Sequence, residues 1–334
     1  MHKVSKLWAL LCLTLVMSLV IAACGSSAEE KQAPSSQQST GQSSSQKEDI
    51  SLLKTVYPLK VTDATGETFT FDKAPKRIVS VSPAETEALF AIGLKDEIVG
   101  VSDYDDYPEA VKEKPKMGGI EKPNVEAIIA AEPDIVFTGI SMSEESVKKL
   151  RDLGIVIFKT NPKTIEDVMN NIQLFGQITD HQQEAKAVVD KMKQQLTQVT
   201  EAVKSVPNDE KKKVYIEFAP GWTVGKGEFM DEIIKLAGGV NIASDLQGWS
   251  EINEENIIKA NPDVILYANG VIDTESKKAL DQIIKGRSGW DQINAIQNNQ
   301  VIGLDQNLLS RPGPRVTEGL IEVAKAIYPD LMNK

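Results

Sequence analysis

The chain has 334 residues, and its 48 Asp and Glu against 37 Lys and Arg give it a formal charge of −11. This acidity argues against a nucleic-acid partner, because phosphate binding needs a basic face. Cys12 and His2 lie in a predicted export signal, so the mature chain keeps one cysteine and one histidine, His181. This excludes an internal disulfide and a histidine-rich metal site, and we expect no Ser-His or Cys-His pair. We therefore expect a protein that is not an enzyme and has neither metal nor cofactor.

Residues 1–23 are predicted to be an export signal, in which two lysines precede an apolar run that starts at Leu7. The segment ends Ile21-Ala22-Ala23-Cys24, which resembles the lipobox of bacterial lipoproteins. That resemblance implies a diacylglycerol on Cys24 and a lipid anchor on the extracytoplasmic face of the cell membrane, in a Gram-positive bacterium. A transmembrane anchor is the alternative, since the 17-residue apolar run is at the lower limit for spanning a bilayer.

Residues 24–56 hold the lipidated cysteine and a stretch rich in Ser, Gln and Lys, so we expect a disordered tether. Residues 57–179 are predicted to form an N-terminal α/β lobe. It opens with two alternating strands around Gly66, and a buried strand then leads to a helix beginning at Ser82-Pro83-Ala84-Glu85. Serine, proline and glutamate stand there as N-cap, N1 and N3 of a capping box.

The corner between that strand and helix lies at the carboxyl edge of a parallel sheet, where open α/β sheets bind ligands. By this position Ser82, Pro83 and Glu85 are candidate ligand-binding residues. The next loop carries Tyr104 and Tyr107. Exposed aromatic rings at this edge suit an extended, partly apolar ligand, although Tyr107 packed against the following proline is an equally good interpretation.

A helix over residues 180–206 is predicted from apolar residues at steps of three and four and from the capping-box spacing of Asp180 and Gln183. It would span about 40 Å at 1.5 Å per residue. That length favours a strut joining two bodies over a surface helix of one domain.

The same pattern occurs on both sides of this helix, in residues 124–137 and 253–266, at a constant offset of 129 residues. Each copy has an N-cap asparagine, a short helix, a Pro-Asp turn and a buried strand. The repeat indicates two similar lobes, the second over residues 207–334.

The second lobe offers aromatic and basic ligand candidates. Trp222 lies in a long predicted loop, Ala219–Glu228, where it either stacks on a ligand or covers the core of its own lobe. The large apolar face of Trp249 needs a cover if its loop is solvated. Arg311 and Arg315 flank a Pro-Gly-Pro turn that fixes their direction. Arg311 is the better ligand candidate and Arg315 the better structural one, and Asn307 is included with Arg311.

From about residue 57 onwards the chain resembles the ABC-transporter receptors for cobalamin, ferric siderophores and haem, whose two lobes are joined by one rigid helix. The resemblance is carried by Arg77-Ile-Val-Ser-Val-Ser-Pro-Ala-Glu-Thr-Glu87, Asp106-Tyr107-Pro108, the two Pro-Asp repeats, Gly238-Gly-Val-Asn241, Ser288-Gly-Trp-Asp-Gln-Ile293 and Arg311-Pro-Gly-Pro-Arg315. It implies two Rossmann-like lobes with mainly parallel sheets and a ligand cleft between them.

Within that family the tyrosine loop and the position of Trp249 resemble those of the cobalamin receptors. Gly119-Ile120 departs from them, because cobalamin receptors can have a tryptophan there. The resemblance also implies that Glu126 and Glu255, which match in the two repeats, dock on arginine pockets of the permease. The alternative is that each simply stabilises the N-terminus of its helix through the helix dipole.

The functional hypothesis is a monomeric receptor that captures cobalamin and delivers it to an ABC permease and its ATPase subunits, with only slight lobe closure. A ferric siderophore or haem receptor differs from it only in the chemistry of the cleft. A surface sensor or adhesin without a small ligand is the alternative from another class.

Overall fold

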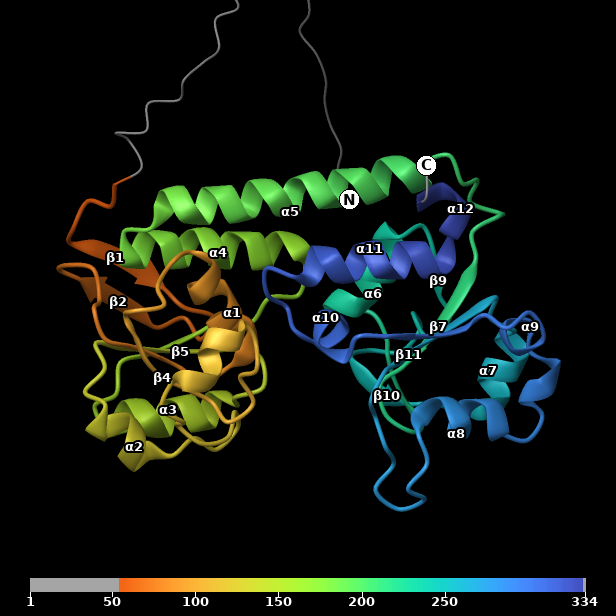
Figure 1. Ribbon diagram of the computed structural model, residues 1–334, viewed down its shortest axis with the longest axis horizontal. Coiled ribbons are helices and arrows are strands. Elements are labelled where there is room, and N and C mark those ends of the chain that lie inside the picture. The colour runs from red at the N-terminus through yellow and green to blue at the C-terminus, as the bar shows by residue number, and fades with distance from the viewer. Residues whose placement is uncertain (1–53, 333–334) are drawn as a thin grey trace, which may run out of the picture. The chain divides into compact units, whose positions relative to one another are not determined.

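The computed structural model describes residues 54–332, which form two α/β lobes joined by one long helix (Figure 1). The predicted fold class is confirmed. The predictions for the export signal, for Cys24 and for most of the tether lie outside the described residues. Within the described range, no helix combines the length and apolarity that crossing a membrane requires.

The N-terminal lobe is built on a parallel sheet with the strand order β4-β3-β5-β6. Ahead of it, a separate antiparallel pair forms around the predicted turn at Gly66, whose φ of +84° favours glycine. The strands are β1 (Leu59–Thr62), β2 (Thr68–Phe71), β3 (Ile78–Ser80), β4 (Ile98–Val101), β5 (Ile135–Thr138) and β6 (Ile157–Lys159). The helices are α1 (Pro83–Ala91), the 3-10 helix η2 (Glu109–Glu113), α2 (Val125–Ala130), α3 (Glu144–Asp152) and α4 (Ile165–Thr179).

Helices cover both faces of this sheet because its strands are apolar on both faces. In β5, Ile135 and Phe137 belong to the core that includes residues of α1 and α4. Val136 points to the opposite face, into a second core that contains Ile128 of α2 and Leu150 of α3. A continuous apolar strand of this kind is typical of a parallel sheet between two helix layers.

The C-terminal lobe repeats this topology, as the sequence repeat predicts. Its parallel sheet has the order β12-β11-β7-β9, so in both lobes the first strand lies between the second and the third. The strands are β7 (Lys213–Glu217), β9 (Val240–Asn241), β11 (Val264–Ala268) and β12 (Val301–Leu304). The helices are α6 (Phe229–Leu236), α7 (Glu254–Ala260), α8 (Leu280–Gly286), η3 (Trp290–Gln292), α9 (Asn294–Gln297), α10 (Gln306–Ser310), α11 (Val316–Ile327) and α12 (Pro329–Met332).

The prediction of one long loop over Ala219–Glu228 is wrong, because this segment contains a strand. β8 (Trp222–Val224) pairs antiparallel with β10 (Trp249–Glu251) and forms a two-stranded ribbon. The segment Trp-Thr-Val has strong β propensity, and Thr223 and Val224 are fully buried. Gly225 directly follows β8. A Cβ atom at this position would lie 2.2 Å from the carbonyl oxygen of Leu246, so the close approach of the two segments requires glycine.

The long helix α5 (Gln182–Val203) lies along α4 of the first lobe and α11 of the second (Figure 1). Its 22 residues span about 33 Å. The predicted apolar stripe is confirmed, since Ala185, Val189, Met192, Val199 and Val203 are buried in one core cluster that continues into both lobes. A helix whose buried face is shared by two lobes resists bending between them.

The start of α5 differs from the prediction. Asp180 does not cap α5 but ends α4, with a left-handed φ of +59°, and His181 precedes α5 without a side-chain cap. Aspartate tolerates this conformation, and its carboxylate accepts a hydrogen bond from the backbone N–H of Thr55 at 2.8 Å. α4 and α5 are therefore two helices that meet at a tight corner, and α5 is shorter than residues 180–206.

Candidate ligand-binding cavity

A cavity of about 500 Å³ lies between the two lobes, at the carboxyl ends of their parallel strands. The corner after β3 and the segment after β5 form one wall, and α10, which follows β12, forms another. Its lining residues are Ser82, Pro83, Ala84, Glu85, Tyr104, Ile120, Ile140, Ser141, Trp249, Gln306, Asn307, Ser310, Arg311 and Pro312. A neighbouring pocket of about 410 Å³ shares Tyr104, Ile120 and Ser141 and extends the cavity towards Glu121 and Lys122.

Seven of the nine sequence-derived ligand candidates line this cavity. They come from four segments that are far apart in the chain, and they are Ser82, Pro83, Glu85, Tyr104, Trp249, Asn307 and Arg311. The rings of Tyr104 and Trp249 are both exposed, at 62% and 46%. An exposed tyrosine and an exposed tryptophan on opposite lobes offer two apolar faces to a flat ligand.

Tyr107 and Trp222 do not belong to the lining of this cavity. Tyr107 stacks under the guanidinium of Arg315, whose Cζ lies 3.9 Å from the ring centroid, and both line a separate pocket beside α5. Tyr107 therefore packs in the lobe interface. Trp222 is 41% exposed on the ribbon, where it pairs with Glu251, two residues along from Trp249.

Sequence reasoning missed the segment after β5, which contributes Ile140 and Ser141. The signal was present, because β5 is the strand of the first sequence repeat and its carboxyl end lies at the same edge as the corner after β3. It also missed Glu87 and Asp106, the partners of Arg311. Charge pairing across two lobes leaves no local pattern in a sequence.

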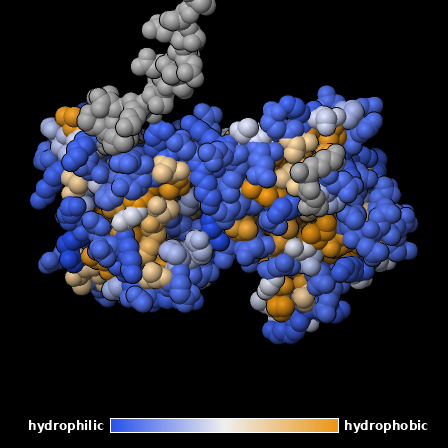
Figure 2. Space-filling view, turned by 45° about the horizontal axis from the view of Figure 1, so that its top comes forward, coloured by the Kyte–Doolittle hydropathy of each residue, from blue (hydrophilic) through white to orange (hydrophobic). Residues whose placement is uncertain are grey.

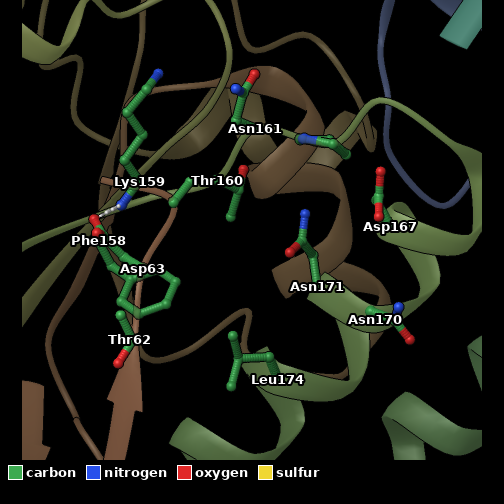
Figure 3. A pocket seen from close by; sticks show the side chains of 12 residues that line it. Thr62, Asp63, Phe158, Lys159, Thr160, Asn161, Asp167, Asn170, Asn171 and Leu174 are labelled. Carbon is green, nitrogen blue, oxygen red and sulfur yellow. Dashed lines mark hydrogen bonds between the residues drawn. The ribbon is translucent and has the colours of Figure 1, made fainter. Parts of the chain in front are cut away.

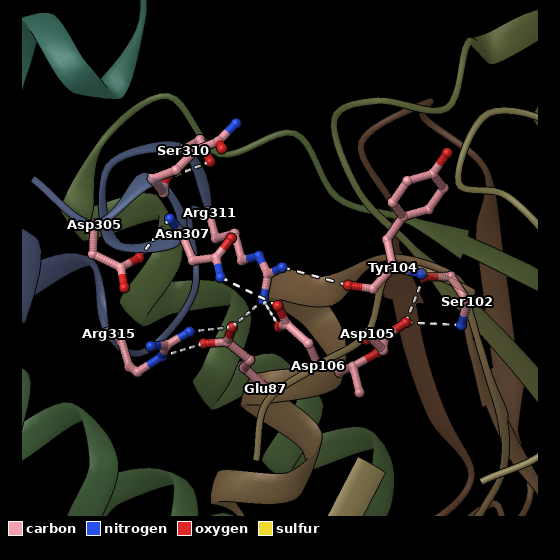
Figure 4. Close-up of polar contacts among 12 residues, drawn as sticks. Glu87, Ser102, Tyr104, Asp105, Asp106, Asp305, Asn307, Ser310, Arg311 and Arg315 are labelled. Atoms are coloured by element: carbon pink, nitrogen blue, oxygen red, sulfur yellow. Dashed lines mark hydrogen bonds and ion pairs between the residues drawn. The ribbon is translucent and has the colours of Figure 1, made fainter. Parts of the chain in front are cut away.

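Arg311 is the centre of an ion-pair network that crosses between the lobes (Figure 4). Its Nη1 donates to Glu87 Oε1 at 3.0 Å and to Asp106 Oδ1 at 2.6 Å. Asn307 Nδ2 donates to the other oxygen of Asp106 at 3.3 Å. Arg315 donates to both oxygens of Glu87, at 2.8 Å and 2.7 Å. Arg311 thus lines the cavity with its charge already balanced, and Arg315 has the structural role that the sequence favoured.

Arg311 also holds the loop that carries Tyr104. The carbonyl oxygen of Tyr104 accepts a hydrogen bond from Arg311 Nη2 at 3.4 Å, and its ring points away from the network (Figure 4). Asp105 holds the loop from beneath, because its Oδ2 accepts from the backbone N–H and the hydroxyl of Ser102, at 2.7 Å and 2.5 Å. Burial raises the pKa of the Asp105 carboxyl, and the hydrogen bonds from Ser102 oppose that shift.

The capping box predicted for Ser82 and Glu85 does not form. The Ser82 side chain makes no cap hydrogen bond, and Glu85 turns away from the helix start into the sheet edge. Its Oε1 accepts a hydrogen bond of 2.5 Å from the hydroxyl of Thr160, which follows β6. The glutamate is 4% exposed, so the protein places a buried carboxyl group at the cavity wall.

Glu126 and Glu255 occupy matching positions in the first turns of α2 and α7. Each helix is capped by the predicted asparagine, since Asn124 and Asn253 accept hydrogen bonds of 3.0 Å from backbone N–H groups. Both glutamates are exposed, and neither has an ion pair among the residues that the structure describes. The two carboxylates are therefore available to an external partner.

A smaller pocket of about 250 Å³ lies within the first lobe, between the β1–β2 pair and α4 (Figure 3). Its two buried charged groups already have partners. Asp63 accepts from Arg151 and from the backbone N–H of Lys159, at 2.5 Å and 2.9 Å. Lys159 Nζ donates to the carbonyl oxygens of Gly139 and Met142 at 2.6 Å. These contacts connect the end of β1 to β6 and α3, so the charged groups of this pocket serve the structure of the lobe.

The surface of the described body is mainly hydrophilic on the face shown in Figure 2, with apolar side chains in separate patches. Across residues 54–332, no group of three or more His, Cys, Asp or Glu side chains is arranged to hold a metal ion.

Two α/β lobes of equal topology, with a cavity at their facing carboxyl edges and one shared helix, define a two-lobed solute-binding protein. The chain belongs to the periplasmic binding protein family, which matches residues 78–308. It is a substrate-binding protein of an ABC transporter and not an enzyme. As such it has a small-molecule ligand and a membrane permease as partners.

Three comparisons support this assignment. An uncharacterised ABC transporter substrate-binding lipoprotein of Bacillus subtilis is 35% identical over 99% of both chains. A cobalamin-binding protein of Halobacterium salinarum is 26% identical, over 81% of this chain and 74% of its own. A solved Staphylococcus epidermidis protein, described as a possible iron-binding, periplasmic solute-binding protein, is 33% identical with a TM-score of 0.64. That alignment covers 77% of this chain and all of the other.

Proposed function

We propose that the protein binds a corrinoid, cobalamin or a close relative, in the cavity between its lobes. The observation that carries this choice is the charge balance of the cavity. Arg311 is the only cation among its described lining residues, and it is paired with Glu87 and Asp106. A neutral, amide-rich ligand can occupy such a site without separating these ion pairs.

An anionic ligand meets a higher cost in the same site. A haem carboxylate that bound the remaining N–H groups of Arg311 would bring a third negative charge to a guanidinium that Glu87 and Asp106 already share. Lys122 in the neighbouring pocket is exposed and adjacent to Glu121, so it attracts an anion only weakly. The cavity therefore favours a neutral cargo. The name of the Halobacterium relative supports the same choice.

A ferric siderophore or haem receptor is the second candidate, and one observation favours it. The hydroxyl of Tyr104 is exposed in the cavity and has no hydrogen-bond partner in the described part of the chain, so it is available to ligate iron. The description of the Staphylococcus protein points in the same direction. The sensor or adhesin hypothesis has no observation of this kind in its favour.

Replacement of Tyr104 with phenylalanine separates the two candidates, because it removes the hydroxyl and keeps the ring. We expect Tyr104→Phe to bind cyanocobalamin within about threefold of the unchanged protein, since stacking uses the ring face. Calorimetric titration with cyanocobalamin and with haem measures both affinities. A variant that keeps haem binding undiminished argues against iron ligation by Tyr104. Haem binding by the unchanged protein that is lost in the variant would favour the second candidate.

Delivery is proposed to use the two exposed glutamates. Glu126 and Glu255 would each pair with basic side chains of the permease, so that one lobe contacts each half of a two-fold partner. The proposal also includes a monomeric receptor, ATPase subunits on the far side of the membrane and a lipid on Cys24. The description of the Bacillus relative as a lipoprotein supports the anchor.

A further inference from the structure

One carboxyl oxygen in the cavity wall is buried without a partner. Glu85 Oε1 accepts a hydrogen bond from the hydroxyl of Thr160. The hydroxyl of Ser82 lies near the carboxyl, but within the residues that the structure describes no hydrogen bond of good geometry reaches Oε2. Glu85 itself lines the cavity between the lobes. A buried polar atom that lacks a partner costs free energy, and a ligand that supplies the partner recovers it.

The surrounding backbone is fitted closely around this oxygen. A Cβ atom on Gly139, just after β5, would lie 2.5 Å from Glu85 Oε2 and 2.7 Å from the hydroxyl oxygen of Ser82. Glycine at this position is therefore needed for close approach, since any side chain would collide with both groups. The strand end thus leaves the carboxyl and the hydroxyl side by side at the cavity wall.

The charged groups near Glu85 do not neutralise it by direct contact. Lys159 is the nearest cation, but its Nζ donates to the carbonyl oxygens of Gly139 and Met142. Lys159 also interacts electrostatically with Glu144 of α3, Asp63 after β1 and Lys163. Arg311, across the cavity, is paired with Glu87 and Asp106. The charge near this carboxyl is thus already shared among other groups.

Burial in this surrounding favours the neutral form of the carboxyl group. It raises the pKa of Glu85, and the hydroxyls of Ser82 and Thr160 and the charge of Lys159 oppose the shift without cancelling it. Burial also lowers the pKa of Lys159. Both groups are thus shifted towards their uncharged forms.

We propose that Glu85 determines the specificity of the cavity as a protonated carboxylic acid, whose Oε2–H donates a hydrogen bond to an amide carbonyl oxygen of the bound ligand. This assignment rests on the proposed function, because it takes the cavity as the cargo site and an amide-bearing molecule as the cargo. Glu85 is only 4% exposed, and a ligand that covers the cavity wall removes its remaining contact with solvent. Ionisation of Glu85 therefore weakens binding, because the complex would bury an anion that has lost its proton.

The direct test is the affinity for cyanocobalamin as a function of pH. In the unchanged protein we expect the affinity to be constant at low pH and to fall about tenfold per pH unit above the pKa of Glu85. Glu85→Gln keeps a donor at this position and cannot ionise, so its affinity should not fall with pH. Glu184→Gln, which changes an exposed carboxylate on α5 outside the cavity, is the matched control and should retain the fall.

Thermal stability of the ligand-free protein gives a second readout that does not depend on the cargo. Because the folded pKa of Glu85 is raised, the protein gains stability from it at low pH and loses that gain as pH rises through the folded pKa. Glu85→Gln should remove this part of the decline in Tm, and Glu184→Gln should not.

The outcomes separate the two proposals. A pH-independent affinity in the unchanged protein, or an equal fall in Glu85→Gln, overturns the role of Glu85. Absence of cyanocobalamin binding at every pH overturns the proposed cargo instead. Haem and a ferric hydroxamate would then be titrated in the same series, and a pH-independent affinity for whichever of them binds would also overturn the role of Glu85.

Discussion

Glu87→Ala should destabilise the protein by about 3–5 kcal/mol, the range found when one partner of a buried ion pair is removed. The Glu87 side chain is 2% exposed and holds two guanidinium groups from the other lobe. Its removal leaves Arg311 with Asp106 alone and leaves Arg315 without a carboxylate. The lost ion pairs join the two lobes, so the lobes should also unfold less cooperatively.

Urea denaturation measures this loss, and a surface pair provides the control. Glu322 pairs with Lys325 at 2.8 Å on α11, with both side chains about half exposed. Glu322→Ala should therefore change the free energy of unfolding by about 1 kcal/mol or less. A similarly small loss in Glu87→Ala would show that the network does not hold the lobes together.

Glu126→Arg and Glu255→Arg should each abolish uptake of the ligand in cells without changing its affinity for the purified protein. Reversal of a charge at a docking contact places like charges together and costs several kcal/mol, which corresponds to about 100-fold weaker docking or more. The ligand affinity stays constant because neither glutamate lines the cavity. Transport of labelled ligand in cells and calorimetry on the purified variants measure the two effects.

The control for these variants is Glu184→Arg, an exposed glutamate in the first turn of α5. It changes the net charge by the same amount on another element and should leave uptake intact. Normal uptake in both docking variants would mean that the glutamates only stabilise their helices, the role that the helix dipole alone explains.

The sequence predicted those parts of the fold that depend on local periodicity. The apolar stripe of α5 and the offset of 129 residues between repeats were sufficient for the strut and the two lobes. Strand ends can also be located from the sequence, and because ligand sites of parallel sheets lie at strand ends, this argument identifies Ser82, Pro83 and Glu85 as candidates.

The errors arose where tertiary contacts outweigh local signals. Asp180 has the spacing of an N-cap, yet a contact with Thr55, 125 residues away, stabilises it as the end of α4. Glu85 has the spacing of a capping box, yet Thr160 draws its carboxyl into the sheet edge. Arg311 was expected to be free for a ligand, and its distant partners Glu87 and Asp106 carry no sequence signal that connects them with it.

The measurement that tests the central claim most directly is a calorimetric titration of the compact unit Asp49–Lys334 with cyanocobalamin, haem and a ferric hydroxamate in parallel. Tryptophan fluorescence would be followed at the same time, because Trp249 lines the cavity. We predict stoichiometric binding of cyanocobalamin alone, with quenching that is reduced in Trp249→Phe. Binding of haem or the ferric hydroxamate, with no response to cyanocobalamin, would contradict the assignment of a corrinoid as the cargo.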